Sequence, residues 1–217
     1  MRPNRRAILQ TALGLGAAVA CRGALALQPT PAQTRGPFYP VTRPLEADAD
    51  LTRLAGHAER AEGRVVHLMG RVLDAAGRPV AGAKVELWQA NARGRYAHPR
   101  DVNAAPLDPN FQGFGSQSTD ADGQFRFKTV KPAAYPVNPM NPRAVRTPHI
   151  HFAFESGAAT LVTQLYFPGE RHNDSDGIYG GLTDAEQRAV TGSILPATPD
   201  LEPDSILLRW DVVLAGG

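Results

Sequence analysis

The alternation of apolar and polar residues predicts short β-strands along most of the chain. Each alternating stretch ends near a cluster of turn-forming residues, such as Asp120–Gly123. In a strand with period two, every second side chain faces the core. Many short strands separated by turns predict an all-β fold, an antiparallel β-sandwich. The expected strands are Arg64–Leu73, Ala83–Ala90, Gln124–Lys128, Ile150–Phe154, Thr160–Phe167 and Ser205–Leu214.

Two short helices are expected beside these strands, at Asp48–Leu54 and Thr183–Val190. In the second, Thr183 and Glu186 have the spacing of a capping box. Two long loops interrupt the strand pattern, from Asn91 to about Gly115 and from Lys131 to Pro148. The second loop contains five prolines, which make it stiff without regular structure. Loops of this length in a compact domain are commonly functional, so both are expected to form the active site.

The first 26 residues have the pattern of an export signal. Arg5 and Arg6 precede an apolar run that ends near Ala20, and Ala24–Ala26 is a suitable cleavage site. The paired arginines resemble a twin-arginine signal. Ala18–Cys21 also resembles a lipoprotein cleavage site, which would give Cys21 a lipid anchor. We therefore expect an exported, periplasmic or extracellular protein without a membrane span. The expected organisation is a signal at 1–26, an extension at 27–63 and the β-sandwich domain at 64–217.

The overall composition suits a globular protein, because 42% of the residues are hydrophobic and 20% are charged. The formal charge of +2 gives no reason to expect a nucleic-acid partner. Removing the signal takes away four arginines and no acid, so the remaining charge is near −2. It also removes Cys21, the single cysteine. Without that thiol, disulfides, thiolate metal ligands and a cysteine nucleophile are excluded.

Two histidines mark the place where the proline-rich loop ends. His149 and His151 stand at positions i and i+2 of a predicted strand, so both imidazoles project from one face. Neutral imidazole is a common metal ligand, and this pair is a candidate metal site. The pair alone does not identify the metal or the remaining ligands.

Seven stretches between about residues 33 and 214 carry recognisable motifs. They are Gln33–Pro40, Gly94–Tyr96, Ala105–Phe111, Asp120–Phe127, Lys131–Pro136, Arg146–Phe152 and Thr163–Phe167. Together these stretches resemble the intradiol ring-cleaving dioxygenases, a family that includes the iron-bearing subunit of protocatechuate 3,4-dioxygenase.

The resemblance implies a non-haem Fe(III) ion bound by two tyrosines and two histidines. The matching positions are Tyr96, Tyr135, His149 and His151. It also implies that Tyr135 leaves the metal and accepts substrate protons. Arg146 would stabilise negative charge on the substrate ring, and Gln164 would be a polar residue of the pocket. The implied reaction joins O₂ to a catechol-type substrate of the protocatechuate, catechol or hydroxyquinol class. The ring opens between its two hydroxylated carbons and gives a cis,cis-muconate-type diacid.

The chain departs from the family pattern at one position beside the predicted site. Many relatives carry a tryptophan two residues after the second ligand tyrosine, where this chain has Val137. The change alters the rim of the pocket and leaves the ring substituent open. The sequence also leaves open whether the protein forms a homo-oligomer or pairs with a homologous subunit.

Two other interpretations of the sequence remain. Val65–Trp88 also resembles a prealbumin-like sandwich module, so the chain could be an exported, non-catalytic binding protein with a prealbumin-like core. Such a module would have no need for two tyrosines and two histidines at the motif positions. Alternatively, the histidine pair could bind copper or zinc, which would leave Tyr96 and Tyr135 unexplained.

Overall fold

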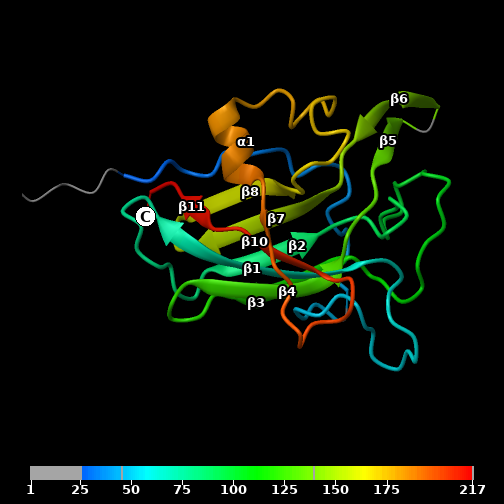
Figure 1. Ribbon diagram of the computed structural model, residues 1–217, viewed down its shortest axis with the longest axis horizontal. Helices are drawn as coiled ribbons and strands as arrows, with labels where there is room; N and C mark the ends of the chain where they lie inside the picture. The colour runs from blue at the N-terminus through cyan, green and yellow to red at the C-terminus, as the bar shows by residue number, and fades with distance from the viewer. Residues whose placement is uncertain (1–25, 45, 139, 217) are drawn as a thin grey trace, which may run out of the picture.

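The computed structural model describes residues 26–44, 46–138 and 140–216. Its strands form two packed sheets and a separate hairpin (Figure 1). The first sheet contains β1 (Val65–Asp74), β4 (Gln124–Val130), β9 (Ser193–Leu195), β10 (Ile206–Arg209) and β11 (Val212–Leu214). The second contains β2 (Lys84–Trp88), β3 (Phe114–Ser118), β7 (His149–Ser156) and β8 (Ala159–Tyr166), in the order β3-β2-β7-β8. The hairpin is β5 (Tyr135–Asn138) with β6 (Asn141–Arg146), and α1 spans Asp184–Val190.

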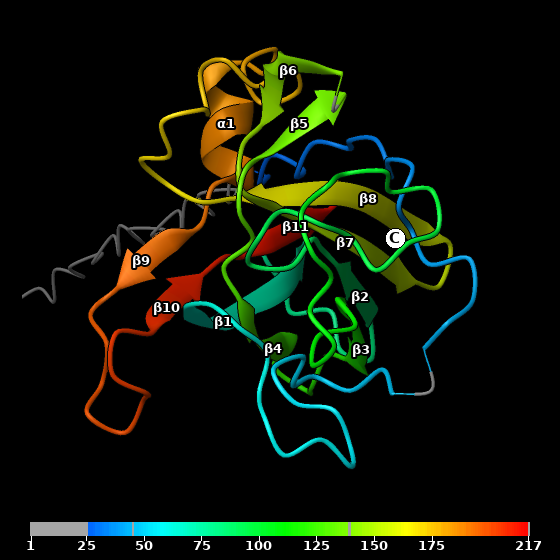
Figure 2. The same cartoon turned by 90° about the vertical axis from the view of Figure 1, so that its right-hand side faces the viewer.

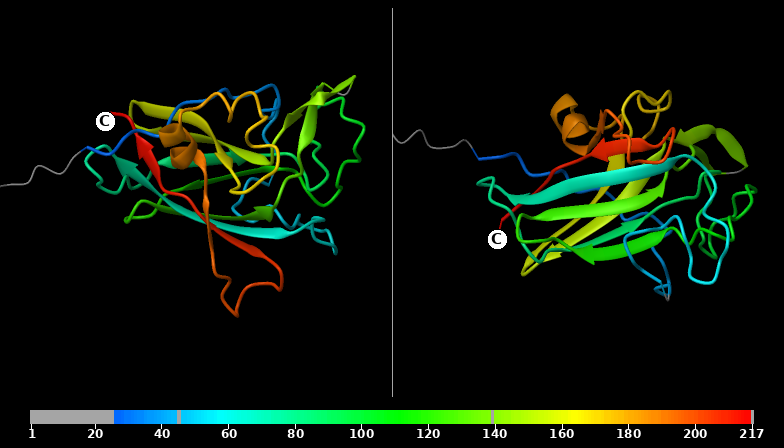
Figure 3. Two further views of the ribbon diagram at one scale, coloured as in Figure 1. Left: turned by 45° about the horizontal axis from the view of Figure 1, so that its top comes forward. Right: turned by 60° about the horizontal axis from the view of Figure 1, so that its bottom comes forward.

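These sheets confirm the predicted β-sandwich, with one difference in strand direction. The β1–β4, β2–β3, β2–β7 and β7–β8 pairs are antiparallel, whereas β10 and β11 both run parallel to β1. The predicted strand Ser205–Leu214 is therefore two strands, broken at Trp210 and Asp211. There the Asp211 carboxylate, rather than a backbone carbonyl, accepts the Arg71 N–H at 3.1 Å. The segment that joins β9 to β10 projects from the sandwich (Figure 3).

The main core lies between the two sheets and fixes the orientation of β7. Ile150, Phe152 and Phe154 are fully buried in it, packed with residues such as Phe125 and Trp210. The alternating positions of β7 therefore face outward from the sandwich. Two of these positions are His149 and His151, and both are nevertheless 2% exposed. A second layer must cover this outer surface, and it is built by loops and by the N-terminal segment.

The helix predicted at Asp48–Leu54 is absent, and the structure gives a physical reason. Asp48 accepts the Asp50 N–H and Asp50 accepts the Thr52 N–H, both at 2.9 Å. Such side-chain bonds compete with helical hydrogen bonds. The segment instead joins the edge of β4, where the Leu51 N–H donates to Lys128 O at 2.8 Å. The other predicted helix is confirmed as α1, with the Thr183–Glu186 capping box in place.

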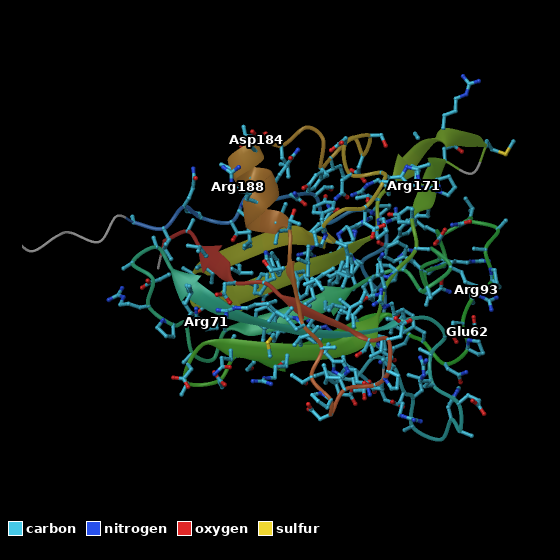
Figure 4. All side chains as sticks on the ribbon, viewed as in Figure 1. Glu62, Arg71, Arg93, Arg171, Asp184 and Arg188 are labelled. Atoms are coloured by element: carbon cyan, nitrogen blue, oxygen red, sulfur yellow. The ribbon has the colours of Figure 1, made fainter. Side chains whose placement is uncertain are left out.

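The two long loops gather at one end of the sandwich, which faces the viewer in Figure 2. The loop at 131–148 was expected to lack regular structure, and this was wrong, because it folds into the β5–β6 hairpin. A bulge between Pro136 and Asn138 accommodates the proline, which cannot donate to the ladder. The other loop, between β2 and β3, has no long regular element. Its acidic and amide side chains hydrogen-bond to backbone groups of the same loop. Figure 4 shows Glu62 and Arg93 at this end, where they form an ion pair.

The predicted signal at 1–26 and Cys21 fall almost entirely outside the described residues. No helix in the described part of the chain is long and apolar enough to cross a membrane. Parts of the predicted extension at 27–63 contact the sandwich. For example, the Thr30 N–H donates to Val213 O at 2.9 Å.

Candidate metal and active site

The four aromatic rings predicted as ligands meet at the loop end of β7. The ring centroids of His149 and His151 are 4.9 Å apart, and those of Tyr96 and Tyr135 are 5.7 Å apart. Tyr135 and His149 are also separated by 5.7 Å, and Tyr96 and His151 by 6.2 Å. The Tyr96 hydroxyl lies 3.4 Å from Nε2 of His149. Residues 96, 135, 149 and 151 therefore form one compact group, although they come from three different segments.

Both histidines are neutral and carry nitrogen lone pairs that could bind a metal. Burial and then the charge of Arg146 lower the pKa of His149 to about 3. Burial lowers the pKa of His151 well below its ordinary value, with a further contribution from His149. Nδ1 of His149 donates to Thr147 O at 2.6 Å, which leaves Nε2 as the free acceptor facing Tyr96. Nδ1 of His151 is buried without a hydrogen-bond partner.

The two tyrosines are protonated in this environment unless a cation is added. Burial raises the pKa of Tyr96 well above its ordinary value, and the neighbouring Tyr135 raises it further. Burial also raises the pKa of Tyr135, opposed by the charge of Arg146. A trivalent cation would favour both phenolates, because ligands bind in their deprotonated form. Two neutral imidazoles and two phenols thus fit a hard, highly charged metal ion.

Tyr96 is held in place by an aspartate within its own loop. Its N–H donates to Oδ2 of Asp101 at 2.6 Å, and Asp101 also accepts the Asn103 N–H. Gly94 lets this loop approach the hairpin closely. It has φ of +82°, and a Cβ there would lie 3.0 Å from Ala134 O. Only glycine adopts that conformation without strain and leaves room for Tyr135 nearby.

Strand register places Arg146 and Gln164 beside the ligand group. Arg146 is the cross-strand partner of Tyr135 in the hairpin, and Gln164 is the partner of His151 in the β7–β8 pair. The Arg146 guanidinium donates to Gln164 Oε1 at 2.6 Å. Gln164 is fully buried, and its Nε2 donates to Thr34 O at 3.2 Å. Gln164 therefore links the arginine to the N-terminal segment instead of lining the open pocket.

Sequence reasoning missed Asp176, a fully buried carboxylate that binds Arg146. Its Oδ2 accepts from Arg146 Nε and from the Thr147 N–H, each at 2.8 Å. Its Oδ1 accepts the N–H groups of Ile178 and Tyr179. The neighbouring Asp174, Ser175 and Gly177 make this stretch look like an ordinary surface turn. The sequence carried no sign that one of its carboxylates binds Arg146.

Sequence reasoning also missed the structural role of residues 31–39, here called the N-terminal strap. The strap runs along the free edge of β8, where the Gln33 N–H donates to Val162 O at 2.8 Å. Phe38 packs on Tyr96 with ring centroids 4.7 Å apart. A Cβ on Gly36 would lie 3.2 Å from Cε1 of His151. The strap is thus the cover that buries the two histidines on the outside of the sandwich.

Tyr166 and Trp88 lie beside the histidines on the same face of the sheet. Trp88 pairs with His151 across β2 and β7, and their rings stack 5.0 Å apart. Tyr166 is fully buried, and its hydroxyl lies within hydrogen-bond distance of Oε1 of Gln164, at 3.1 Å, and of Oε1 of Gln33, at 3.2 Å. Among the residues that the structure describes, no three His, Cys, Asp or Glu side chains gather as metal ligands. The groups that accompany the histidine pair are the two tyrosines.

Comparison with known proteins identifies the family. The family model described as "Dioxygenase" matches residues 34–216. The chain belongs to the intradiol ring-cleavage dioxygenase family. It is 43% identical over 172 residues to the protocatechuate 3,4-dioxygenase beta chain of Burkholderia cepacia. The aligned region covers 78% of this chain and 72% of the relative. The predicted family is therefore confirmed.

Some of the matched relatives are longer than this chain. The chain is 37% identical over 159 residues to the 6-chlorohydroxyquinol 1,2-dioxygenase of Cupriavidus pinatubonensis, covering 68% of this chain and 54% of the relative. Its fold matches the crystal structure of catechol 1,2-dioxygenase from Pseudomonas arvilla with a TM-score of 0.66 and 26% identity, over 87% of this chain and 62% of that one. The fold also matches the dioxygenase domain of a Streptomyces carbohydrate-binding fusion protein, with a TM-score of 0.63 and 27% identity. This match covers 88% of this chain and all of that domain.

Proposed function

We propose that the protein is a non-haem Fe(III) intradiol dioxygenase acting on a catechol-type diol. The observation that carries the proposal is the group of Tyr96, Tyr135, His149 and His151 beside a partly buried Arg146. In the net reaction, one O₂ adds both oxygen atoms to the diol. The bond between the two hydroxylated ring carbons breaks, and a cis,cis-muconate-type diacid forms.

The four rings of the group are the proposed iron ligands. Phenolate oxygens are hard anionic donors, which stabilise Fe(III) over Fe(II). When bound, the ion would supply Lewis acidity and a template that holds the diol. The Nδ1–Thr147 hydrogen bond fixes the tautomer of His149 and keeps Nε2 directed at the ligand group.

Tyr135 is the proposed proton acceptor for the substrate hydroxyls. It lies at the edge of the hairpin and lines the open cavity, whereas Tyr96 is 3% exposed and held by its loop. A phenolate oxygen at the cavity wall can take a proton from an incoming diol at its Oη. Tyr96 has no comparable freedom, so it would remain a fixed ligand throughout.

Arg146 is the proposed electrostatic group of the reaction. Its guanidinium lines the same cavity as Tyr135, and its charge is permanent at any working pH. Preorganised charge of this kind stabilises electron density that develops on the substrate ring. Gln164 and Asp176 would hold the guanidinium in one orientation instead of touching substrate.

Analysis of the products tests this proposal directly. The iron-loaded protein, incubated with catechol and ¹⁸O₂, should give a cis,cis-muconate that carries label from O₂. Cleavage beside the diol would give a yellow semialdehyde and would contradict the proposal. Arg146→Ala should retain iron but lower turnover about 100-fold or more, the scale of losing one preorganised donor.

We also propose that the protein is exported and associates with other subunits. The paired Arg5 and Arg6 before an apolar run support export. One relative bears the name "beta chain", which supports a partner subunit for this chain or a homo-oligomer. Size-exclusion chromatography of the purified chain tests the second point, because an active monomer would contradict it.

A further inference from the structure

A cavity of about 430 Å³ opens directly beside the proposed active site. Tyr135 and Arg146 line it next to the ligand group, and Thr34 and Ser175 add two hydroxyls. The strap contributes Pro37 and Phe38, and the hairpin contributes Val137. A single catechol ring does not fill a space of this size, so part of the cavity is available to a ring substituent.

The side chains along the cavity rim are mainly apolar. Val137 is 60% exposed, which is unusual for a branched aliphatic residue in a hairpin. Val145 and Ile178 are partly exposed and line the same space as Pro37. Contact of these groups with an apolar substituent would remove aliphatic surface from water on both sides.

The cavity offers little to a charged substituent. Arg146 is the one cationic side chain among the described residues that line it. That guanidinium is already bound to the buried Asp176 carboxylate and to Gln164. A carboxylate on the substrate ring would meet a guanidinium already paired with Asp176, mainly aliphatic walls and a few neutral hydroxyls, so it would lose hydration without gaining a cation of its own.

A second cation, Arg100, lies close by in a different space. It lines an adjacent cavity of about 270 Å³ that shares Pro37, Phe38, Tyr135 and Val137 as walls. Its guanidinium donates to Pro37 O at 2.7 Å, which fixes it against the strap. Arg100 therefore lines the neighbouring space and not the one beside Arg146, although the two spaces adjoin.

We propose that the substrate is a catechol whose ring carries an uncharged, apolar substituent, seated against Val137, Val145 and Ile178. This inference rests on the proposed function and names the substrate class of the same site. It predicts that the enzyme prefers a substrate with an alkyl group, and not a carboxylate, at the ring position opposite the diol.

The test compares kcat/KM of the iron-loaded enzyme for catechol, 4-propylcatechol and 3,4-dihydroxybenzoate. We expect propylcatechol to exceed dihydroxybenzoate by about 10-fold or more, the scale set by apolar contacts in a pocket. Val137→Lys should reverse or abolish this ratio. The matched control is Ile194→Lys on β9, an equally exposed aliphatic position outside the cavity, which should leave the ratio unchanged.

Binding to the iron-free protein gives a readout independent of turnover. Under anaerobic conditions, propylcatechol should raise the melting temperature more than dihydroxybenzoate does. If the enzyme cleaves catechol but has a higher kcat/KM for dihydroxybenzoate than for propylcatechol, the inference is overturned and the proposed function remains intact. Loss of that preference in Arg100→Gln would show that Arg100 is the group that binds the carboxylate. Absence of any cleavage, with the melting shifts as expected, would instead overturn the proposed function alone.

Discussion

Arg146 Nε donates to Oδ2 of Asp176 at 2.8 Å, in a pair whose carboxylate is completely buried. The partner residues lie 30 positions apart, on the hairpin and on the loop before α1. Asp176 also accepts three backbone N–H groups, so its position is fixed by the fold. The orientation of the arginine at the proposed active site is therefore set by a residue outside every motif in the sequence.

Asp176→Asn should lower turnover without removing the metal. A neutral amide holds the guanidinium less firmly and cannot accept all four bonds, so kcat should fall about 10- to 100-fold. Stability should fall by about 1–3 kcal/mol, the cost of a disturbed buried polar group. Iron content and the visible spectrum should stay unchanged. The control is Asp174→Asn, an exposed aspartate of the same loop.

The double variant Asp176→Asn with Arg146→Ala separates a positioning role from a general structural one. If Asp176 acts through Arg146, the double variant should be no slower than Arg146→Ala alone. Additive losses in kcat would show that Asp176 contributes in another way.

Tyr96→Phe should change the colour of the iron-loaded protein. Loss of one phenolate removes part of the tyrosinate-to-iron charge transfer, so the expected red-brown band should weaken or shift. Tyr179→Phe is the control, because Tyr179 is equally aromatic and buried but belongs to a separate cluster beneath α1. A wild-type protein that takes up zinc stoichiometrically, and shows no visible band after iron loading, would contradict the ligand assignment.

Gly36→Ala should loosen the strap at the histidine pair. The φ of +70° is strained for alanine, and the new methyl group would lie 3.2 Å from Cε1 of His151. We expect weaker iron binding and a lower melting temperature. Gly169→Ala is a matched control, since Gly169 has φ of +73° with no atom within 4 Å of an added Cβ. If both variants bind iron equally well, the contact with His151 has no effect on the metal site.

Glu202 should make stability depend on pH in the acid range. Hydrogen bonds from Lys128 and His67 lower the pKa of Glu202 to about 2 in the folded protein, against about 4.5 for an unperturbed glutamate. Its stabilising effect is therefore complete above about pH 4.5 and is lost as the pH falls towards 2. The effect is small because the side chain is 41% exposed.

Thermal melts across this pH range check the expectation. Wild type and Glu202→Gln should differ most near pH 5 to 7 and converge as the pH falls. The exposed Glu59→Gln should show no such trend. If the difference in melting temperature between wild type and Glu202→Gln increased as the pH fell, it would contradict the direction of the pKa shift.

Export is expected to remove the first 20 to 26 residues. Fractionation of the native host, followed by mass spectrometry of the N-terminus, should place a shortened chain outside the cytoplasm. Replacing Arg5 and Arg6 by lysine tests the twin-arginine route and should retain the protein inside the cell. A full-length cytoplasmic protein in the native host would argue against the signal.

Several features could be read from the sequence because they depend on local rules. Alternation predicted most strands, and Thr183 with Glu186 predicted the one helix seen in the described residues. Period-two geometry placed His149 and His151 on one face. Motif resemblance named Tyr96 and Tyr135 as their companions, and the fold brings all four rings together. Their role as iron ligands stays a prediction.

Tertiary structure decided what depends on partners distant in the sequence. Alternation could not show that the histidine face of β7 is the outer one, because that depends on the strap that covers it. A helix was expected at Asp48–Leu54, where hydrogen bonds to β4 favour an extended edge instead. Asp176 gave no signal, since a carboxylate in a turn looks the same whether it is solvated or buried under Arg146. Local sequence determines which backbone conformations have low free energy, while burial and hydrogen bonding across the fold decide which side chains come into contact.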